Sequence, residues 1–286
     1  MNNYTPTWMK ILKHAVIWLT IVFCMFPILW ALSASFNPAN TLVGQPLIPE
    51  EISFSNYETL FTSQQHPFAT WLFNSVKIAL IASFGSVALT TLAAYPFSRF
   101  NFWGRRNGLF MILLVQVFPQ MLAMVALYLL FLNVQTIFPA VGINTHPAVI
   151  ITYMGGAIGV NTWLMKGYMD TIPRSIEDAA FIDGASGFQI FYRIILPLSK
   201  PILGVLFVIQ FIASYSEYVL ARVLLNSTDR LTLAVGLHLF VAEDYGGRWG
   251  VFSAAAMLGA IPIIILFMLV QDHIVTGFLS GGGVKG

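Results

Sequence analysis

The sequence predicts an all-α integral membrane protein with six transmembrane helices. Of its 286 residues, 57% are hydrophobic and 9% are charged, whereas soluble domains are about 45–50% apolar and about 25% charged. Its mean hydropathy is +0.78. The apolar residues also fall into runs close to the ~20 residues that cross the hydrocarbon core of a bilayer. These runs must be helices, because a spanning segment satisfies its own backbone hydrogen bonds.

The apolar runs give six predicted spans in a single membrane domain over residues 1–286. Charged interruptions are few, with Lys77 in the second span and Glu217 in the fifth. The first run is longer than the ~7–15 residues of a signal-peptide core, so we predict a retained helix. No internal repeat or low-complexity linker divides the chain. The predicted spans are 15–36, 71–97, 109–132, 147–165, 201–221 and 251–271.

The basic residues orient these spans. With the N-terminus in the cytoplasm, the inner segments hold ten of the 14 Lys and Arg residues, and the outer loops hold three. Lys and Arg are enriched on the cytoplasmic side of membrane proteins. Both termini are therefore predicted to be cytoplasmic, together with a loop at 166–200 and a tail at 272–286, while 222–250 is an outer loop. The ten inner residues are Lys10, Lys13, Arg99, Arg105, Arg106, Lys166, Arg174, Arg193, Lys200 and Lys285.

One stretch of the inner loop, RSIEDAAFIDGASGFQIFYRIILP at 174–197, concentrates charge in a chain that has little of it. Pro173 keeps a helix from extending upstream, and Ser175 with Asp178 fits a capping box. Gly184 suits a helix end. The pattern predicts a short helix with a face of small residues that another protein surface can approach closely. The alternative is an interfacial helix that lies on lipid.

This stretch resembles the EAA loop of the membrane subunits of ATP-binding-cassette (ABC) importers. That signature has Glu-Ala-Ala, three residues, Gly, nine residues, Ile, one residue and Leu-Pro. The spacing here is the same, but Asp178 stands where the family has Glu, and Glu177 lies beside it. The resemblance implies a coupling helix that docks on an ATPase. Its expected coupling residues are Glu177, Asp178, Ala179, Ala180, Asp183, Gly184, Ile194, Leu196 and Pro197.

The likeness extends along nearly the whole chain. FSNYETLF, LAAYPFSRFNFWGRR and WLMKGY are similar to carbohydrate-importer permeases, and the C-terminal third, with LTLAVGL and GGGVKG, resembles the smaller membrane subunits of maltose/maltodextrin importers. The resemblance implies the type I ABC importer permease fold in a prokaryotic cell membrane. It also implies a sugar importer, with maltose or maltodextrin as the expected substrate and another saccharide as the alternative.

The resemblance also implies the partners of the chain. These are a second, unlike permease, a dimer of cytosolic ABC ATPase subunits and an extracytoplasmic sugar-binding protein. The lipid bilayer surrounds the chain. ATP and Mg are expected on the ATPase, since this chain has no GxxxxGK[ST] phosphate loop. The chain itself is expected to bind no cofactor and to catalyse no reaction, and no basic run suggests nucleic acid. The expected binding-protein contacts are Asn226, Leu239, Tyr245 and Gly246, and the expected ATPase contacts of the tail are Gly282, Gly283 and Lys285.

No catalytic, metal-binding or substrate residue is predicted. The five histidines are scattered without metal-ligand spacing, and aromatic residues are also needed for membrane belts. Glu217 is a functional candidate as an intramembrane carboxylate, or it reaches out to water or to Arg222 about one turn away. An ion-coupled secondary transporter remains an alternative, although such proteins have more intramembrane ionisable residues and inverted repeats. A membrane enzyme would need converging polar residues inside the spans.

Overall fold

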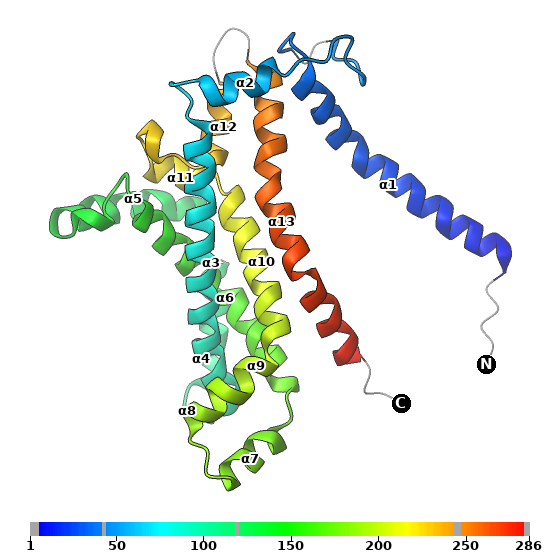
Figure 1. Ribbon diagram of the computed structural model, residues 1–286. Helices are drawn as coiled ribbons and strands as arrows, with labels where there is room; N and C mark the ends of the chain where they lie inside the picture. The colour runs from blue at the N-terminus through cyan, green and yellow to red at the C-terminus, as the bar shows by residue number, and fades with distance from the viewer. Residues whose placement is uncertain (1–5, 42–43, 118–119, 243–246, 283–286) are drawn as a thin grey trace. The chain divides into compact units, whose positions relative to one another are not determined.

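The computed structural model describes residues 6–41, 44–117, 120–242 and 247–282, and these residues form helices and connections without any strand (Figure 1). They form two compact units. Unit 1 comprises Met1–Phe68 and Gly236–Ala260, and unit 2 comprises Ala69–Val235 and Ile261–Gly286. Each unit has its own internal packing and is described by itself.

Unit 1 joins the end of α1 (Thr7–Phe36) to α2 (Ser55–Thr62) and to the start of α13 (Trp249–Gly282). Asn56 of α2 is 1% exposed. Its side-chain amide donates hydrogen bonds to the carbonyl oxygens of Ser35 (3.0 Å) and Asn37 (2.9 Å), which helps to satisfy the C-terminal carbonyls of α1. A Cβ atom at Gly250 of α13 would lie 2.5 Å from this amide nitrogen, so a larger residue there would displace the Asn56 side chain.

Unit 2 is built on two long apolar helices, α3 (Phe68–Arg99) and α6 (His146–Thr171). The helices α4 (Arg105–Gln116) and α5 (Gln120–Ile137) lie between them in the chain, and α10 (Lys200–Ser216) and α11 (Val219–Leu224) follow. Two hydrogen bonds hold α4 on α6. The side chain of Gln116 donates to the carbonyl oxygen of Gly156 at 2.8 Å, and the indole of Trp163 donates to that of Leu109 at 3.3 Å.

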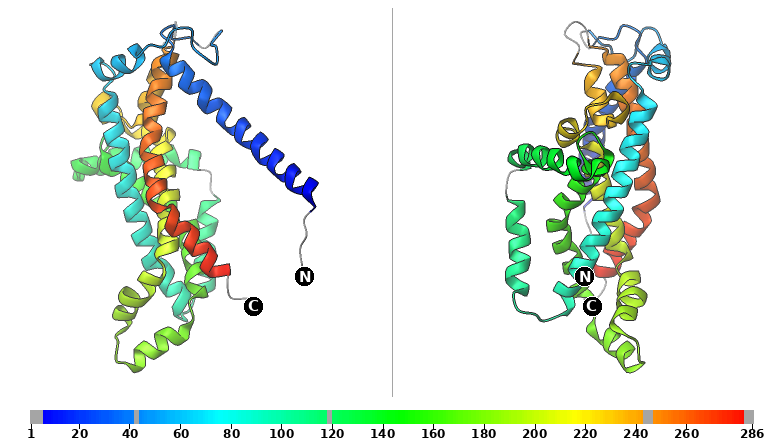
Figure 2. Two further views of the ribbon diagram at one scale, coloured as in Figure 1. Left: turned by 45° about the vertical axis from the view of Figure 1, so that its right-hand side comes forward. Right: turned by 90° about the vertical axis from the view of Figure 1, so that its left-hand side faces the viewer.

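The charged stretch forms α7 (Arg174–Ile182), α8 (Gly187–Ile190), a π-helical turn at Phe191–Ile195 and α9 (Leu196–Leu198). The helix Gly187–Leu198 meets α10 at an angle of 71°. Beneath this bend is a core of buried apolar side chains. They are Ala94, Met165, Met169, Ile172, Ile190, Ile195 and Leu206. Within unit 2, α7 lies beyond one end of α3, and α11 lies near the other end (Figures 1 and 2).

The described helices only partly match the predicted spans. By length and composition α1, α3, α6 and Trp249–Gln271 can each cross a membrane, and the bent helix pair is a fifth candidate. The predicted third span, 109–132, is divided between α4 and α5, and the predicted fifth span is interrupted after Ser216. The total of six spans therefore stays a prediction.

Two predicted connections contain more helix than the sequence suggested. The outer loop 222–250 includes a 3₁₀ turn at Thr228–Arg230 and the helix α12 (Leu233–Leu239). Its apolar residues Leu231, Leu233 and Val235 are buried, which explains why it is not a simple solvated loop. The predicted tail from residue 272 is helical as far as Gly282, because α13 continues through it.

Candidate functional site

The start of α7 differs from the predicted capping box. The helix begins directly after Pro173, whose backbone is already extended, and no side chain caps its first turn. Ser175 therefore lies inside the helix, and its predicted pairing with Asp178 is wrong. A capping box does form one helix later, at the start of α8. There Ser186 accepts from the backbone N–H of Gln189 at 3.3 Å, and the Gln189 side chain accepts from that of Ser186 at 2.8 Å.

The predicted helix end at Gly184 is confirmed. Its φ is +83°, the left-handed conformation that favours glycine. The N–H groups of Gly184 and Ala185 donate to the carbonyl oxygens of Phe181 (3.0 Å) and Ala180 (2.9 Å). This is the Schellman arrangement, which satisfies the last carbonyls of a helix and stops it sharply.

Gly184→Ala is expected to destabilise the end of α7 by about 1 kcal/mol, the usual cost of a left-handed alanine. The cost is purely conformational, because a Cβ atom at this position meets no atom within 4 Å. Gly184→Asn should cost less, since Asn tolerates this conformation. Gly187→Ala is the control, as that glycine has equal space and no positive φ. Amide hydrogen exchange at Ala185 measures the effect, and equal protection in all three variants would contradict it.

The predicted coupling residues of α7 divide between two faces. Glu177 is 7% exposed, and Ala180 is half-buried against the apolar core. Asp178, Ala179, Asp183 and Gly184 are exposed. The exposed face also carries Ile182, with 86% of its surface exposed. We call Asp178, Ala179, Ile182 and Asp183 the α7 face. Ile182 was not predicted as a contact, although an isoleucine at the end of a charged helix was the available signal.

The second half of the motif serves mainly to join α8 to α10. Ile194 lies in the π-helical turn and packs half-buried against the core. Leu196 is also half-buried, whereas Pro197 is exposed in α9. A π-helical turn is rare and is often found at functional sites. It connects α8 rigidly to the bend that precedes α10.

A buried ion pair fixes α7 to the end of α3. The Arg99 Nε and Glu177 Oε1 atoms lie 2.5 Å apart, and the two side chains are 6% and 9% exposed. The Arg99 guanidinium also donates to the carbonyl oxygen of Ile172 and to the Ser98 hydroxyl, both at 3.2 Å. A charge buried to this degree requires such partners. From the sequence, Arg99 was predicted only as an inner basic residue, since no local pattern connects it with Glu177.

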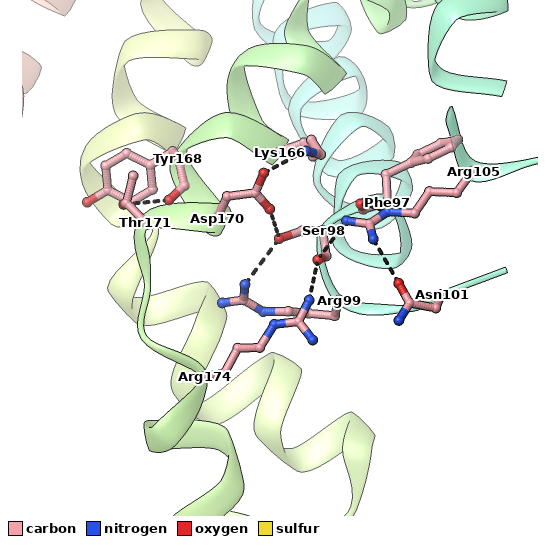
Figure 3. Close-up of polar contacts among 10 residues, drawn as sticks. All are labelled: Phe97, Ser98, Arg99, Asn101, Arg105, Lys166, Tyr168, Asp170, Thr171 and Arg174. Atoms are coloured by element: carbon pink, nitrogen blue, oxygen red, sulfur yellow. Dashed lines mark hydrogen bonds and ion pairs between the residues drawn. The ribbon is translucent and has the colours of Figure 1, made fainter. Parts of the chain in front are cut away.

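The end of α6 joins the same junction (Figure 3). The Ser98 hydroxyl donates to Asp170 Oδ1 at 2.7 Å, and Lys166 Nζ lies 2.6 Å from Asp170 Oδ2. Arg174, the first residue of α7, donates to the carbonyl oxygen of Ser98 at 3.2 Å. The last turn of α3 therefore holds α6 and α7 together.

Arg105 at the start of α4 completes the junction (Figure 3). Its guanidinium donates to the carbonyl oxygens of Phe97 (2.8 Å) and Ser98 (3.2 Å) and to the side chain of Asn101 (3.0 Å). A cation at this position satisfies C-terminal carbonyls of α3 and interacts favourably with the helix dipole. We call this group of contacts among α3, α4, α6 and α7 the basic junction.

At the other end of unit 2, Glu217 marks the break between α10 and α11. Its carboxylate accepts a hydrogen bond from the Tyr153 hydroxyl at 2.7 Å. It also accepts from the backbone N–H groups of Leu220 (2.8 Å) and Ala221 (3.0 Å), which are otherwise unpaired at a helix start. Among the described residues no ion pair joins it to Arg222. Glu217 thus starts α11 and ties it to α6.

Asn144 anchors the segment that follows α11. With a φ of +61°, it places its side-chain oxygen 3.0 Å from the backbone nitrogens of both Asn226 and Ser227. Its amide donates to the Ser227 hydroxyl at 2.6 Å. Trp71 of α3 donates to the carbonyl oxygen of Thr228 at 2.7 Å. The backbone at Asn226, a predicted binding-protein contact, is therefore held in place while the residue itself is exposed.

The remaining predicted contacts are less informative. Leu239 is half-buried in unit 1, and Gly282 is the last residue of α13. Tyr245, Gly246, Gly283 and Lys285 lie outside the described residues. Within the described ranges, no three His, Cys, Asp or Glu side chains are grouped so that they could hold a metal ion.

Comparison with known proteins agrees with this architecture. Residues 86–279 match the family described as "Binding-protein-dependent transport system inner membrane component". The maltose/maltodextrin transport system permease protein MalG of Yersinia pestis is 42% identical over 285 residues, which cover 96% of this chain and 92% of that protein. The galactooligosaccharides transport system permease protein GanQ of Bacillus subtilis is 40% identical over 266 residues, which cover 93% of this chain and 92% of that protein.

The fold also matches a solved structure. A chain of a bacterial ABC transporter involved in the import of the acidic polysaccharide alginate has a TM-score of 0.78, covering 95% of this chain and 99% of that one. At 23% sequence identity this likeness establishes the fold alone. The predicted all-α permease fold is confirmed, and the chain belongs to the family of binding-protein-dependent transport system inner membrane components.

Proposed function

We propose that this chain is a permease subunit of an ATP-driven sugar importer and forms half of its translocation pathway. The observation that carries the proposal is the exposed α7 face on a helix that buried contacts fix to the membrane helices. Arg99 and Glu177 hold α7 to α3, and Arg174 holds it to the same turn. A force applied to α7 by a partner is therefore passed to α3 and α6 instead of being absorbed by a flexible loop.

The partner that applies this force is a dimer of cytosolic ABC ATPase subunits, which bind ATP and Mg. ATP favours one arrangement of the dimer, and α7 follows it, so the permease changes between two states with different accessibility. A second, unlike permease completes the pathway. The extracytoplasmic binding protein delivers the sugar near Asn226, which follows α11 in the chain. Within unit 2, α11 lies away from α7 (Figure 1).

We expect both termini and α7 to lie in the cytoplasm. The basic junction supports this orientation, because Arg99, Arg105, Lys166 and Arg174 meet at the end of α3, and such residues are enriched on the inner side. Cys24 is the only cysteine. In a Cys24→Ser background, Arg193→Cys, at an exposed position outside the α7 face, should react with a membrane-impermeant maleimide in inverted vesicles and not in intact cells. The opposite pattern would reverse the topology.

We propose maltose or maltodextrin as the substrate, with a galactooligosaccharide as the runner-up. The named relatives support both, at 42% and 40% identity. The binding protein and the second permease determine the choice, since no substrate residue is predicted in this chain. Proteoliposomes that contain the full importer should accumulate labelled maltotriose when ATP is present. Accumulation of a galactooligosaccharide alone would select the runner-up.

Coupling through the α7 face is tested by reversing one of its charges. Asp178→Lys should lower co-purification with the ATPase and ATP-dependent uptake by at least about tenfold. Reversing a charge at an interface brings like charges together, which costs more than ~1.4 kcal/mol. Glu51→Lys is the matched control, an exposed carboxylate in unit 1. If the wild-type chain associates with no ABC ATPase in mild detergent, the proposed function fails. If both variants retain uptake, the α7 face has no coupling role.

A further inference from the structure

A cleft of about 480 Å³ opens where α4 begins beside the end of α6. Three basic residues, Arg105, Arg106 and Lys166, line it, and no carboxylate does. Phe102 and Leu109 supply apolar lining next to these cations. We propose that this cleft binds the phosphate headgroup of an anionic phospholipid, a site that is separate from the α7 face.

The cleft has positive charge that the protein does not neutralise. Lys166 is paired with Asp170. Arg105 donates hydrogen bonds only to neutral acceptors, and the carboxylate that interacts with its charge, Asp170, is already paired with Lys166. Arg106 is exposed and makes no hydrogen bond or ion pair with the part of the chain that the structure describes. Its guanidinium has five N–H donors in a planar fork that matches a phosphate.

The surroundings of the cleft favour a lipid over a free phosphate ion. The long apolar helix α3 ends at Arg99 and α4 begins at Arg105, so the cleft lies where the chain leaves the hydrocarbon core. Trp103 is 99% exposed beside it. On the first two turns of α4, Phe110 and Met111 are 61% and 63% exposed. Tryptophan is enriched at headgroup depth. Basic pockets between membrane helices on the cytoplasmic side bind acidic lipid headgroups.

A ligand for this site carries a phosphate that reaches Arg106 and acyl chains that lie along the apolar surface of α4. The phosphatidylglycerol headgroup meets both conditions, whereas inorganic phosphate meets only the first and phosphatidylcholine has no net negative charge. The inference does not depend on the sugar that is transported or on ATPase coupling, because it rests on the cleft and its charge.

Native mass spectrometry of the purified full chain, with the subunits that co-purify, tests the proposal. The wild-type chain should retain phosphatidylglycerol in preference to phosphatidylcholine. Arg106→Gln should weaken this retention about fivefold, the effect of one basic residue at an anionic membrane surface. Arg106→Lys should keep most of it. The matched control is Arg193→Gln, which removes an exposed charge of the same kind outside the cleft.

The other outcomes are equally definite. Equal retention of phosphatidylglycerol by the wild type, Arg106→Gln and Arg193→Gln overturns the proposal. So does a wild-type chain that binds inorganic phosphate through Arg106 but retains no phosphatidylglycerol, which would be a small-anion site. If Trp103→Ala lowers association with the ATPase and leaves lipid retention unchanged, the surface belongs to a protein partner and the lipid proposal is wrong.

Discussion

Glu177→Ala is expected to destabilise unit 2 by about 3–5 kcal/mol and to lower the amount of sugar transported per ATP hydrolysed. The first effect follows because the change leaves the Arg99 guanidinium buried without its counter-charge. The second follows because α7 loses its main bond to α3. Thermal unfolding in detergent measures the stability, and parallel uptake and ATPase assays in proteoliposomes measure the coupling.

A double variant separates the structural role of this pair from its positioning role. The double variant Arg99→Met/Glu177→Leu removes both charges, and replacing a buried ion pair by apolar residues is often neutral for stability. Its unfolding temperature should be close to that of the wild type. Its uptake per ATP should remain low, because the hydrogen bonds from Arg99 to Ile172 and Ser98 are also lost. Full recovery of both properties would mean that the pair only stabilises the fold.

Lys166→Ala is the matched control for these experiments. It also breaks an ion pair of the basic junction, but both side chains of that pair are partly exposed, at 22% and 38%. Exposed pairs contribute about 0–1 kcal/mol. The unfolding temperature of this variant should therefore change little. A loss as large as that of Glu177→Ala would show that burial is not what makes the Arg99–Glu177 contact important.

Asn144→Ala is expected to destabilise unit 2 by roughly 3–4 kcal/mol. It removes three side-chain hydrogen bonds, each of which contributes about 1 kcal/mol. It also forces an alanine into a left-handed backbone at φ +61°, for about 1 kcal/mol more. Hydrogen exchange at the amides of Asn226 and Ser227 reports the local loss. Stimulation of the transporter by the binding protein should fall with it, because this segment is the proposed contact.

A series at this position distinguishes the two causes. Asn144→Gly loses the hydrogen bonds without the strain, so it should cost less than the alanine variant. Asn144→Asp keeps an acceptor for both backbone N–H groups and should cost least. Asn133→Ala is the control, since that amide makes a single exposed bond within its own helix. If alanine and glycine at position 144 are equivalent, backbone strain has no part in the effect.

Some features of this protein are encoded in neighbouring residues. The apolar runs predicted the helices α1, α3, α6 and α13, because a segment surrounded by lipid must be apolar along its whole length. The end of α7 at Gly184 was predictable from a different local feature, since glycine adopts a positive φ without strain. The spacing from Asp178 to Pro197 indicated the importer-permease family.

The sequence by itself therefore determined the membrane helices, the helix stop at Gly184 and the family, because each of these follows from short-range sequence patterns. The tertiary structure alone decided that Glu177 turns inward to Arg99, that Asn144 holds Asn226, and that Glu217 starts a new helix bonded to Tyr153. In each of these pairs the partners are far apart in the chain. They meet only because of the way the helices pack, and local periodicity contains no information about which buried polar groups will satisfy one another.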